Sequence, residues 1–256
     1  MFVSAGQTGG LPKFSRIEHI LLVNNLVSFY YRNYECWYTE HLRSFELISS
    51  DNFSVHEVSE LKDTICAEFQ RITNINLKNH FYAKLDQHVP HLQSLFRKKA
   101  ARTGKVAVLD QLFSTYDRQE QVDVHVRRAA VLRGLPAYLH DDDSRFLKLW
   151  DEVQSEEPNI NDIPVGLLLI TGNSTDATFF CPEKIAVVLE GNIVVEFSTL
   201  AEAFVMLFAL IYALHLSYPK DLANTFDFTQ KVLMGLEDGK LKPRVLSLKN
   251  ELLAVE

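Results

Sequence analysis

The chain has 256 residues, of which 47% are hydrophobic and 23% charged, and its formal net charge is −7. This composition is typical of a globular protein and excludes a disordered chain, and the length fits one large domain or two modest ones. The longest uninterrupted apolar run, residues 203–214, falls short of the roughly 20 residues that span a bilayer, so we expect a buried helix and no membrane association.

Residues 1–53 are predicted to form a small antiparallel β module. Two runs of β-branched and aromatic residues, 17–23 and 26–31, flank Asn24-Asn25. Asparagine tolerates the positive φ of a tight turn, so these runs predict a hairpin. Residues 36–38 and 42–48 are expected to add further strands.

Residues 54–157 are predicted to form a helical middle region. Val58, Leu61, Ile65 and Phe69 recur at three- and four-residue steps, which is the helical period. Further helical patterns cover residues 75–99 and 105–116. We expect a break at Pro90, because proline removes a backbone donor and clashes with the preceding turn.

The second half of the middle region predicts two more helices. The first covers residues 120–133 and is expected to stop at Gly134-Leu135-Pro136. Ser144 is expected to cap the second helix, which carries an apolar stripe of Phe146, Leu149, Trp150 and Val153.

Residues 158–256 are predicted to form a C-terminal α+β unit, with the boundary at residues 156–159. A strand over 165–170 precedes a hairpin of 185–189 and 193–197. Thr199 and Glu202 predict the capping box of a buried helix over 200–216. Two amphipathic helices follow: one starts at Asn224 or Thr225 and ends at Gly239, and the last begins at Pro243. The whole chain is predicted to be α+β, with a short C-terminal sheet packed on helices.

Cysteine usage and the N-terminus indicate an intracellular protein, cytoplasmic or nuclear. The first residues carry no positive charge ahead of an apolar stretch, so no secretory signal is visible. Cys36, Cys66 and Cys181 are far apart and form no CxxC pair. We interpret them as reduced, buried thiols.

Basic residues concentrate in the middle of the chain. Residues 78–139 carry 11 basic and 5 acidic side chains, whereas residues 140–157 carry 2 and 7. Either the basic segment offers a positive surface to an acidic partner, or these segments pair within the fold. The candidate nucleic-acid contacts are Arg97, Lys98, Lys99, Arg102, Lys105, Arg127, Arg128 and Arg133.

Residue constellations that support catalysis or metal binding are weak. Zinc needs four ligands, usually in two close pairs, but His80, His88 and His91 supply only one close pair, with Cys66 upstream. The run His140-Asp141-Asp142-Asp143 resembles a carboxylate cluster for a divalent cation, yet its place before Ser144 favours a solvated acidic loop at a helix entry.

Signatures of nucleophilic serines, phosphate loops and dinucleotide sites are missing from the sequence. Cys181 has no neighbouring histidine in the sequence to activate it, and His215 is expected to be a hydrogen-bonded core residue. We therefore expect no catalytic residues, no cofactor and no metal.

From about residue 122 onward the chain resembles the sterile alpha motif domain-containing protein 3-like family. The residues that carry this resemblance are 126–136, 185–191, 212–220 and 225–236. The resemblance implies no established activity, and the sterile alpha motif itself is not recognisable in this sequence. Residues 14–48, with Trp37 and Tyr38 in the run 37–43, resemble a region of uncharacterised, transposon-derived proteins.

The leading hypothesis is a non-enzymatic protein–protein interaction module or scaffold, because the sequence is rich in structural signals and poor in catalytic ones. The alternative is a nucleic-acid-binding protein of mobile-element origin that uses the basic middle segment.

Overall fold

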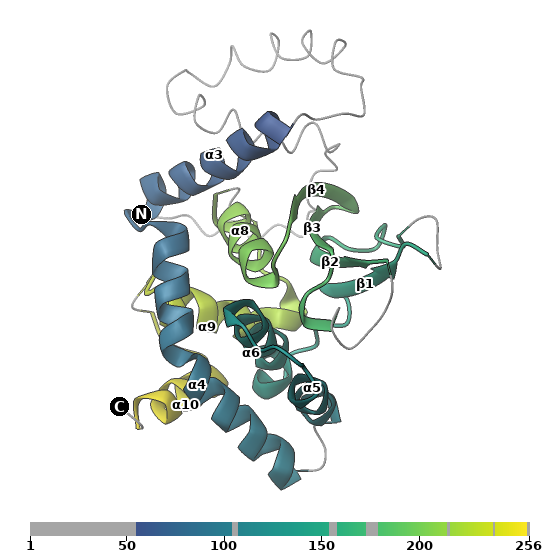
Figure 1. Cartoon of the computed structure of the whole chain (residues 1–256). Helices are drawn as coiled ribbons and strands as arrows, with labels where there is room; N and C mark the ends of the chain where they lie inside the picture. The colour runs from purple at the N-terminus through teal and green to yellow at the C-terminus, as the bar shows by residue number, and fades with distance from the viewer. Residues whose placement is uncertain are drawn as a thin grey trace, which may run out of the picture.

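The computed structural model describes residues 55–103, 107–153, 158–172, 179–213, 216–237 and 239–254. The predicted N-terminal β module therefore lies outside the described residues. Within them, helices pack on one face of a four-stranded mixed sheet, which confirms the α+β class (Figure 1).

The described elements follow one another as helices, then the sheet, then helices again. The first helices are α3 (Val55–Thr73), α4 (Leu77–Thr103), α5 (Ala107–Asp117) and α6 (Val124–Leu139). The strands are β1 (Leu147–Asp151), β2 (Val165–Thr171), β3 (Lys184–Leu189) and β4 (Asn192–Phe197). They are followed by α8 (Leu200–Ala213), a 3-10 turn (Lys220–Leu222), α9 (Ala223–Phe228), a π-helical turn (Thr229–Leu233) and α10 (Pro243–Leu253).

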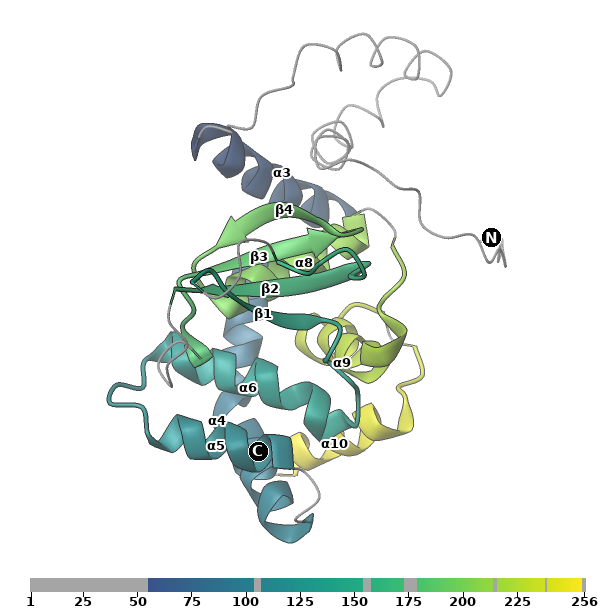
Figure 2. The same cartoon turned by 90° about the vertical axis from the view of Figure 1, so that its right-hand side faces the viewer.

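Helix α8 is the centre of the core. Apart from its half-buried Glu202, every residue from Leu200 to Ile211 is buried, so the helix has no solvent face. It contacts β2, β3 and β4 of the sheet, and also α3, α4 and α6 (Figure 2). Each fully buried phenylalanine contributes about 2–3 kcal/mol, so this enclosure supplies much of the hydrophobic stabilisation.

The N-terminal end of α8 is held by side chains. The hydroxyl of Thr199 accepts a hydrogen bond from the Glu202 amide at 3.4 Å, which confirms one half of the predicted capping box. The Glu202 carboxylate pairs instead with Lys78 of α4 at 2.8 Å. Further along α8, the ring centroid of Phe204 lies 6.2 Å from that of Phe81 and 5.8 Å from that of Phe226. These contacts fix α4 and α9 against the same helix.

The sheet has the order β1-β2-β3-β4, with β1 and β2 parallel and the other pairs antiparallel. Every residue of β2 is buried, because one face packs on the helices and the other on a smaller cluster that includes Ile160 and Ile163. The predicted hairpin of β3 and β4 is confirmed. Glu190 and Gly191 have φ values of +50° and +72°, as a tight hairpin turn requires.

The prediction of a helix after Ser144 is wrong, because residues 147–151 form strand β1. Leu147 pairs with Leu167, and Asp151 pairs with Thr171, in a parallel ladder. The apolar spacing fits a helix, but β2 supplies a strand partner that a short sequence window does not contain. Because β1 precedes residue 157 and β2 follows it, one sheet joins the predicted middle region to the C-terminal unit.

The expected helix breaks at Pro90 and at residues 134–136 are also wrong. Helix α4 continues through Pro90, and α6 continues through Pro136. Each proline removes one hydrogen bond, while buried residues on both sides, such as Leu85 and Phe96, keep the helix packed. A Cβ at Gly134 would lie only 2.8 Å from a ring carbon of Phe96, so glycine allows α4 and α6 to approach closely.

Helix α9 begins at Ala223, and its π-helical extension ends before Gly235 (φ +63°), so the predicted end at Gly239 is wrong. Its first turn is capped by a residue distant in sequence, Asp141. The Asp141 carboxylate accepts hydrogen bonds from the amides of Asn224 (3.0 Å) and Thr225 (2.7 Å) and from the Thr225 hydroxyl (2.8 Å). A negative group is favourable at this end of a helix.

We predict that Asp141→Ala lowers the free energy of unfolding by about 1–3 kcal/mol, because the first turn of α9 loses the acceptor of several hydrogen bonds. Urea unfolding followed by circular dichroism measures the change. Asp142→Ala is the matched control, since that exposed carboxylate accepts hydrogen bonds only from the amide (3.0 Å) and side chain of Ser144, and its loss should have a much smaller effect. Equal losses for the two variants would contradict the capping role.

Candidate functional site

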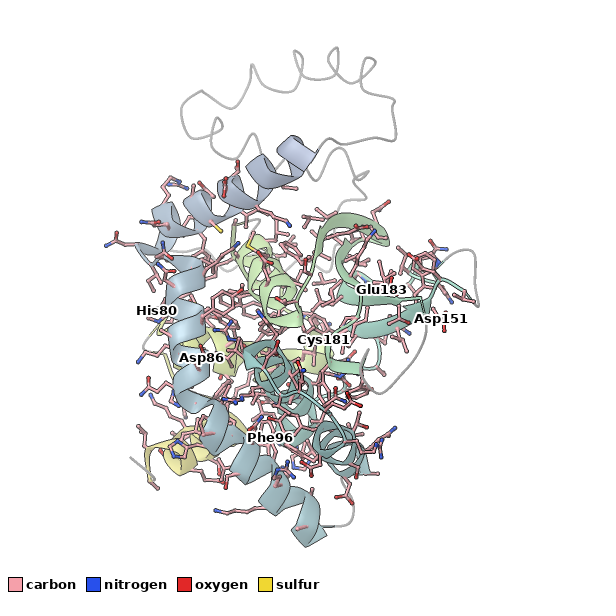
Figure 3. The ribbon with its side chains drawn as sticks, viewed as in Figure 1. His80, Asp86, Phe96, Asp151, Cys181 and Glu183 are labelled. Carbon is pink, nitrogen blue, oxygen red and sulfur yellow. The ribbon has the colours of Figure 1, made fainter. Side chains whose placement is uncertain are left out.

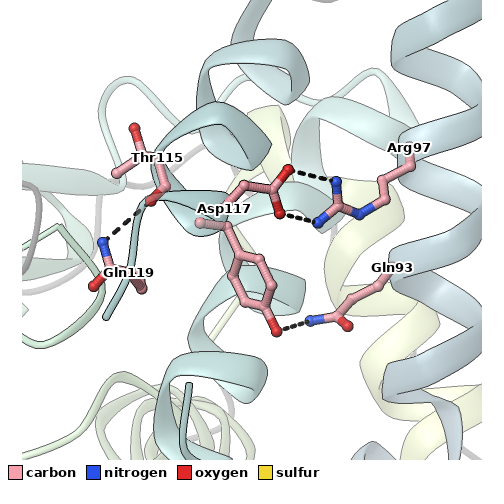
Figure 4. A network of polar contacts seen from close by, with 6 residues as sticks. Gln93, Arg97, Thr115, Asp117 and Gln119 are labelled. Carbon is pink, nitrogen blue, oxygen red and sulfur yellow. Dashed lines mark hydrogen bonds and ion pairs between the residues drawn. The ribbon is translucent and has the colours of Figure 1, made fainter. Parts of the chain in front are cut away.

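Arg97, the first candidate nucleic-acid contact, joins α4 to the end of α5. Its guanidinium donates to both carboxylate oxygens of Asp117, at 2.9 and 2.5 Å (Figure 4). It also lies 4.4 Å from the ring centre of Phe113. The hydrogen bonds from Arg97 hold the pKa of Asp117 below its usual value. Arg97 is therefore committed to a bidentate pair within the fold.

Arg128 repeats this arrangement between α6 and α4. It donates to both carboxylate oxygens of Asp86, at 2.7 and 2.6 Å, while its guanidinium lies 4.3 Å from the ring centre of Tyr82. The side chain of Arg128 is largely covered, whereas that of Asp86 is more exposed. This pair ties the two helices together on the flank of the core.

Lys99 stabilises the C-terminal end of α6. Its ammonium donates to the carbonyl of Tyr138 at 2.5 Å and lies 3.0 Å from Nε2 of His140. Arg244 of α10 donates to the carbonyls of Leu139 and His140 at 3.2 and 3.1 Å. Cations are favourable at this end of the helix dipole. Burial, together with the charges of Lys99 and Arg244, lowers the pKa of His140, so this histidine is neutral at pH 7.

The other predicted nucleic-acid contacts differ in their exposure and in their neighbours within the fold. Lys98 and Arg127 are exposed, and Arg127 donates only a long bond of 3.5 Å to the Val122 carbonyl. The Arg102 side chain and all of Lys105 lie outside the described residues. Arg133 of α6 is mostly buried, with its guanidinium 3.8 Å from the ring centre of Phe179.

The structure therefore gives internal partners to Arg97, Lys99 and Arg128. The acidic partners of Arg97 and Arg128 are Asp117 and Asp86, which lie within the basic segment itself and not in residues 140–157. Pairing within the fold explains these three side chains. Nucleic-acid contact through the wider set stays a prediction.

The predicted carboxylate run does not converge on one point. Asp141 caps α9, and Asp142 accepts from the Ser144 amide in the turn before β1. Asp143 is half-buried, and this burial raises the pKa of its carboxyl. Across the described ranges, no three histidine, cysteine, aspartate or glutamate side chains are placed to share a metal ion. Figure 3 shows His80 and Asp86 along α4, and Cys181 beside the sheet.

The two described thiols have the wrong electrostatics for nucleophiles. Burial raises the pKa of Cys66, whose Sγ lies 3.7 Å from Sδ of Met206. Cys181 is exposed, which corrects the expectation that it is buried, but partial burial and the charge of Asp123 still raise its pKa. Both remain protonated near pH 7, and a thiol reacts as its thiolate.

Strand β1 is the outer strand of the described sheet, and sequence reasoning missed this edge. The Leu167 amide donates to the Phe146 carbonyl and the Glu152 amide to the Thr171 carbonyl, at 2.7 and 3.0 Å. In a parallel ladder alternate residues face the neighbouring strand, so Phe146, Lys148, Trp150 and Glu152 face β2. The backbone of Leu149 therefore points outward, and neither its N–H nor its C=O bonds to any described residue.

Exposed apolar side chains accompany this edge. Leu149 is 61% exposed and Val153 is 74% exposed, and these are the two most exposed large apolar residues in the part of the chain that the structure describes. An outward backbone with apolar neighbours is the arrangement that pairs with another extended chain. The strand signal in the sequence is weak, because only residues 147–149 alternate between apolar and polar, and the helical spacing of Phe146, Leu149, Trp150 and Val153 hid it.

Comparisons with protein-family models, with curated proteins and with solved structures give no match to this chain. The resemblance to the sterile alpha motif domain-containing protein 3-like family thus stays a prediction. No helix in the described ranges is long and apolar enough to cross a membrane.

We predict a coupling free energy of about 1 kcal/mol between Arg128 and Asp86, because the pair is bidentate and backed by Tyr82, although solvent screens Asp86. A double-mutant cycle of Arg128→Met and Asp86→Asn, read by urea unfolding, measures it. The matched cycle replaces Arg128→Met with Lys98→Met and should show no coupling. Equal coupling in both cycles would mean that the net charge, and not the pair, stabilises the fold.

Proposed function

We propose that this protein is a non-enzymatic interaction module that binds an extended segment of a partner protein along the edge of β1. The observation that carries the proposal is the outward backbone of Leu149, which is free of described partners and lies beside the exposed side chains of Leu149 and Val153. None of the other candidate sites among the described residues has a geometry that supports a different activity.

A strand added to a sheet edge gains affinity from backbone hydrogen bonds and specificity from alternate side chains. Leu149 offers one outward donor and one outward acceptor, and Leu147 offers a further outward carbonyl, since its amide already donates to Asp143 at 2.9 Å. Covering the Leu149 and Val153 side chains contributes about 1–2 kcal/mol each. Such a short edge fits a transient contact with micromolar affinity, on the order of 1–100 μM.

The partner segment is expected to be extended and apolar at alternate positions. We predict that a displayed library of random decapeptides, selected on the immobilised protein, yields sequences with this alternation. Their binding should fall about tenfold or more with Leu149→Lys, because the substitution places a charge at the contact, and fluorescence polarisation of labelled peptides measures the loss.

The matched control is Leu246→Lys on α10, because Leu246 is also an exposed leucine but lies on a helix away from the sheet. It should leave peptide binding unchanged. Selected peptides that depend on Leu246 and not on Leu149, or that show no alternation, would contradict a strand-pairing site at β1.

The nucleic-acid hypothesis has a separate test. We expect labelled single- and double-stranded DNA and RNA to show little change in fluorescence anisotropy at near-physiological salt, because Arg97, Lys99 and Arg128 already bind groups of the chain. Tight, salt-sensitive binding that Lys98→Glu with Arg127→Glu abolishes would instead establish the exposed cations as a nucleic-acid surface.

A further inference from the structure

Arg133 stands apart from the other arginines that lie against aromatic rings. Its guanidinium is mostly buried and lies 3.8 Å from the ring centre of Phe179. It donates no hydrogen bond and forms no ion pair with any residue in the described ranges. A guanidinium has five N–H donors, and no nitrogen of Arg133 is fully enclosed by the described residues, so these donors are accessible to a ligand.

The described residues contain two complete versions of the same arrangement. Arg97 lies against Phe113 and holds Asp117, and Arg128 lies against Tyr82 and holds Asp86, each through two hydrogen bonds. In both, the ring supports the flat guanidinium and a carboxylate occupies its donors. Arg133 has the ring in Phe179 but lacks the carboxylate.

Asp143 does not fill that role. Its charge acts on Arg133, but the two side chains are not within ion-pair distance of each other. Burial lowers the pKa of Arg133 to about 10 and raises that of Asp143. Burial is the largest cause of both shifts, and neither side chain forms an ion pair with a described residue.

The site lies next to the open edge of β1. The Asp143 carbonyl accepts from the Leu147 amide at 2.9 Å, which places residue 143 at the start of that edge. Figure 2 shows β1 as the strand nearest α6, the helix that carries Arg133. Because the charge of Asp143 acts on Arg133, the arginine lies near the start of that edge.

We propose that Arg133, held against Phe179, is a recognition site for a carboxylate, carried by an acidic residue of the segment that pairs with β1. The identity of the carrier rests on the proposed function, whereas the carboxylate site itself does not. A carboxylate is favoured over a phosphate because both complete arrangements in this chain hold an aspartate in the same ring-backed geometry.

The direct test follows the Nε–Hε resonances of the arginines by NMR while sodium acetate is added to the whole protein. We expect a saturable shift of the Arg133 resonance with a dissociation constant on the order of 10 mM, as one ring-backed bidentate pair gives. Arg133→Lys assigns the signal, and the exposed Arg127 on the same helix is the internal reference. Because acetate needs no strand pairing, this titration reports on Arg133 whether or not β1 binds a segment.

Two outcomes of the titration overturn the site. The first is an Arg133 shift no larger with acetate than with sodium chloride at equal ionic strength. The second is saturation by inorganic phosphate with no response to acetate, which would replace the carboxylate by a phosphate.

A stability measurement checks that the guanidinium is unpaired in the fold. Arg133→Met keeps an unbranched side chain against Phe179 and removes the buried charge, so the melting temperature should stay equal or rise by about 2–4 °C. A fall of several degrees would show that Arg133 already has an internal partner, and would overturn the proposal.

The peptides whose binding depends on Leu149 test whether the segment that pairs with β1 carries the carboxylate. An acidic residue enriched at one position, and a tenfold loss of affinity with Arg133→Met but not with Arg127→Met, supports a carboxylate from the paired segment. Leu149-dependent peptides without an enriched acidic position would overturn that assignment of the carrier.

Discussion

The enclosure of α8 is the constraint on which the rest of the described structure depends. A helix that is apolar on nearly all sides is stable in water only when other elements cover it completely. The sheet covers one side, and α3, α4 and α6 cover the others. Elements from both sides of residue 157 are needed for this cover, which explains why they share a sheet and a continuous core.

Ion pairs between charged side chains hold the helices around α8 to one another at the edge of the core. Lys78 pairs with Glu202, Arg97 with Asp117 and Arg128 with Asp86, and each pair links two different helices. Exposed pairs contribute little to stability by themselves, but rings behind Arg97 and Arg128 restrict their guanidinium groups and favour the bidentate geometry. Several cations of the basic middle segment thus link helices to one another, while the Leu149 backbone and the Arg133 guanidinium have no hydrogen-bond partner among the described residues.

Local patterns predicted the elements whose partners lie nearby in sequence. The β3–β4 hairpin depends on the turn at Glu190-Gly191, α10 begins at Pro243 as expected, and α3 carries Leu61, Ile65 and Phe69 at helical spacing. These features involve only neighbouring residues, so the sequence contains their causes. The α+β class was predicted from these local elements.

Features that depend on distant partners were not predictable in the same way. Residues 147–151 form a strand because β2 lies beside them, and α9 is capped by Asp141, which lies 83 positions before Asn224. Pro90 and Pro136 stay inside helices because tertiary packing outweighs one lost hydrogen bond each. The candidate contacts were chosen by charge alone. Charge does not reveal that Arg97 forms an ion pair with a carboxylate, whereas Arg133 forms none with any described residue.

The most direct test of this account is residue-resolved hydrogen exchange of the free protein by NMR. The account predicts that amides in the middle of α8 exchange only through global unfolding, and that the Leu149 amide exchanges orders of magnitude faster than those of Lys148 and Trp150, which face β2. Similar protection at all three β1 amides would show that the edge is already covered. Fast exchange within α8 would contradict the central role of that helix.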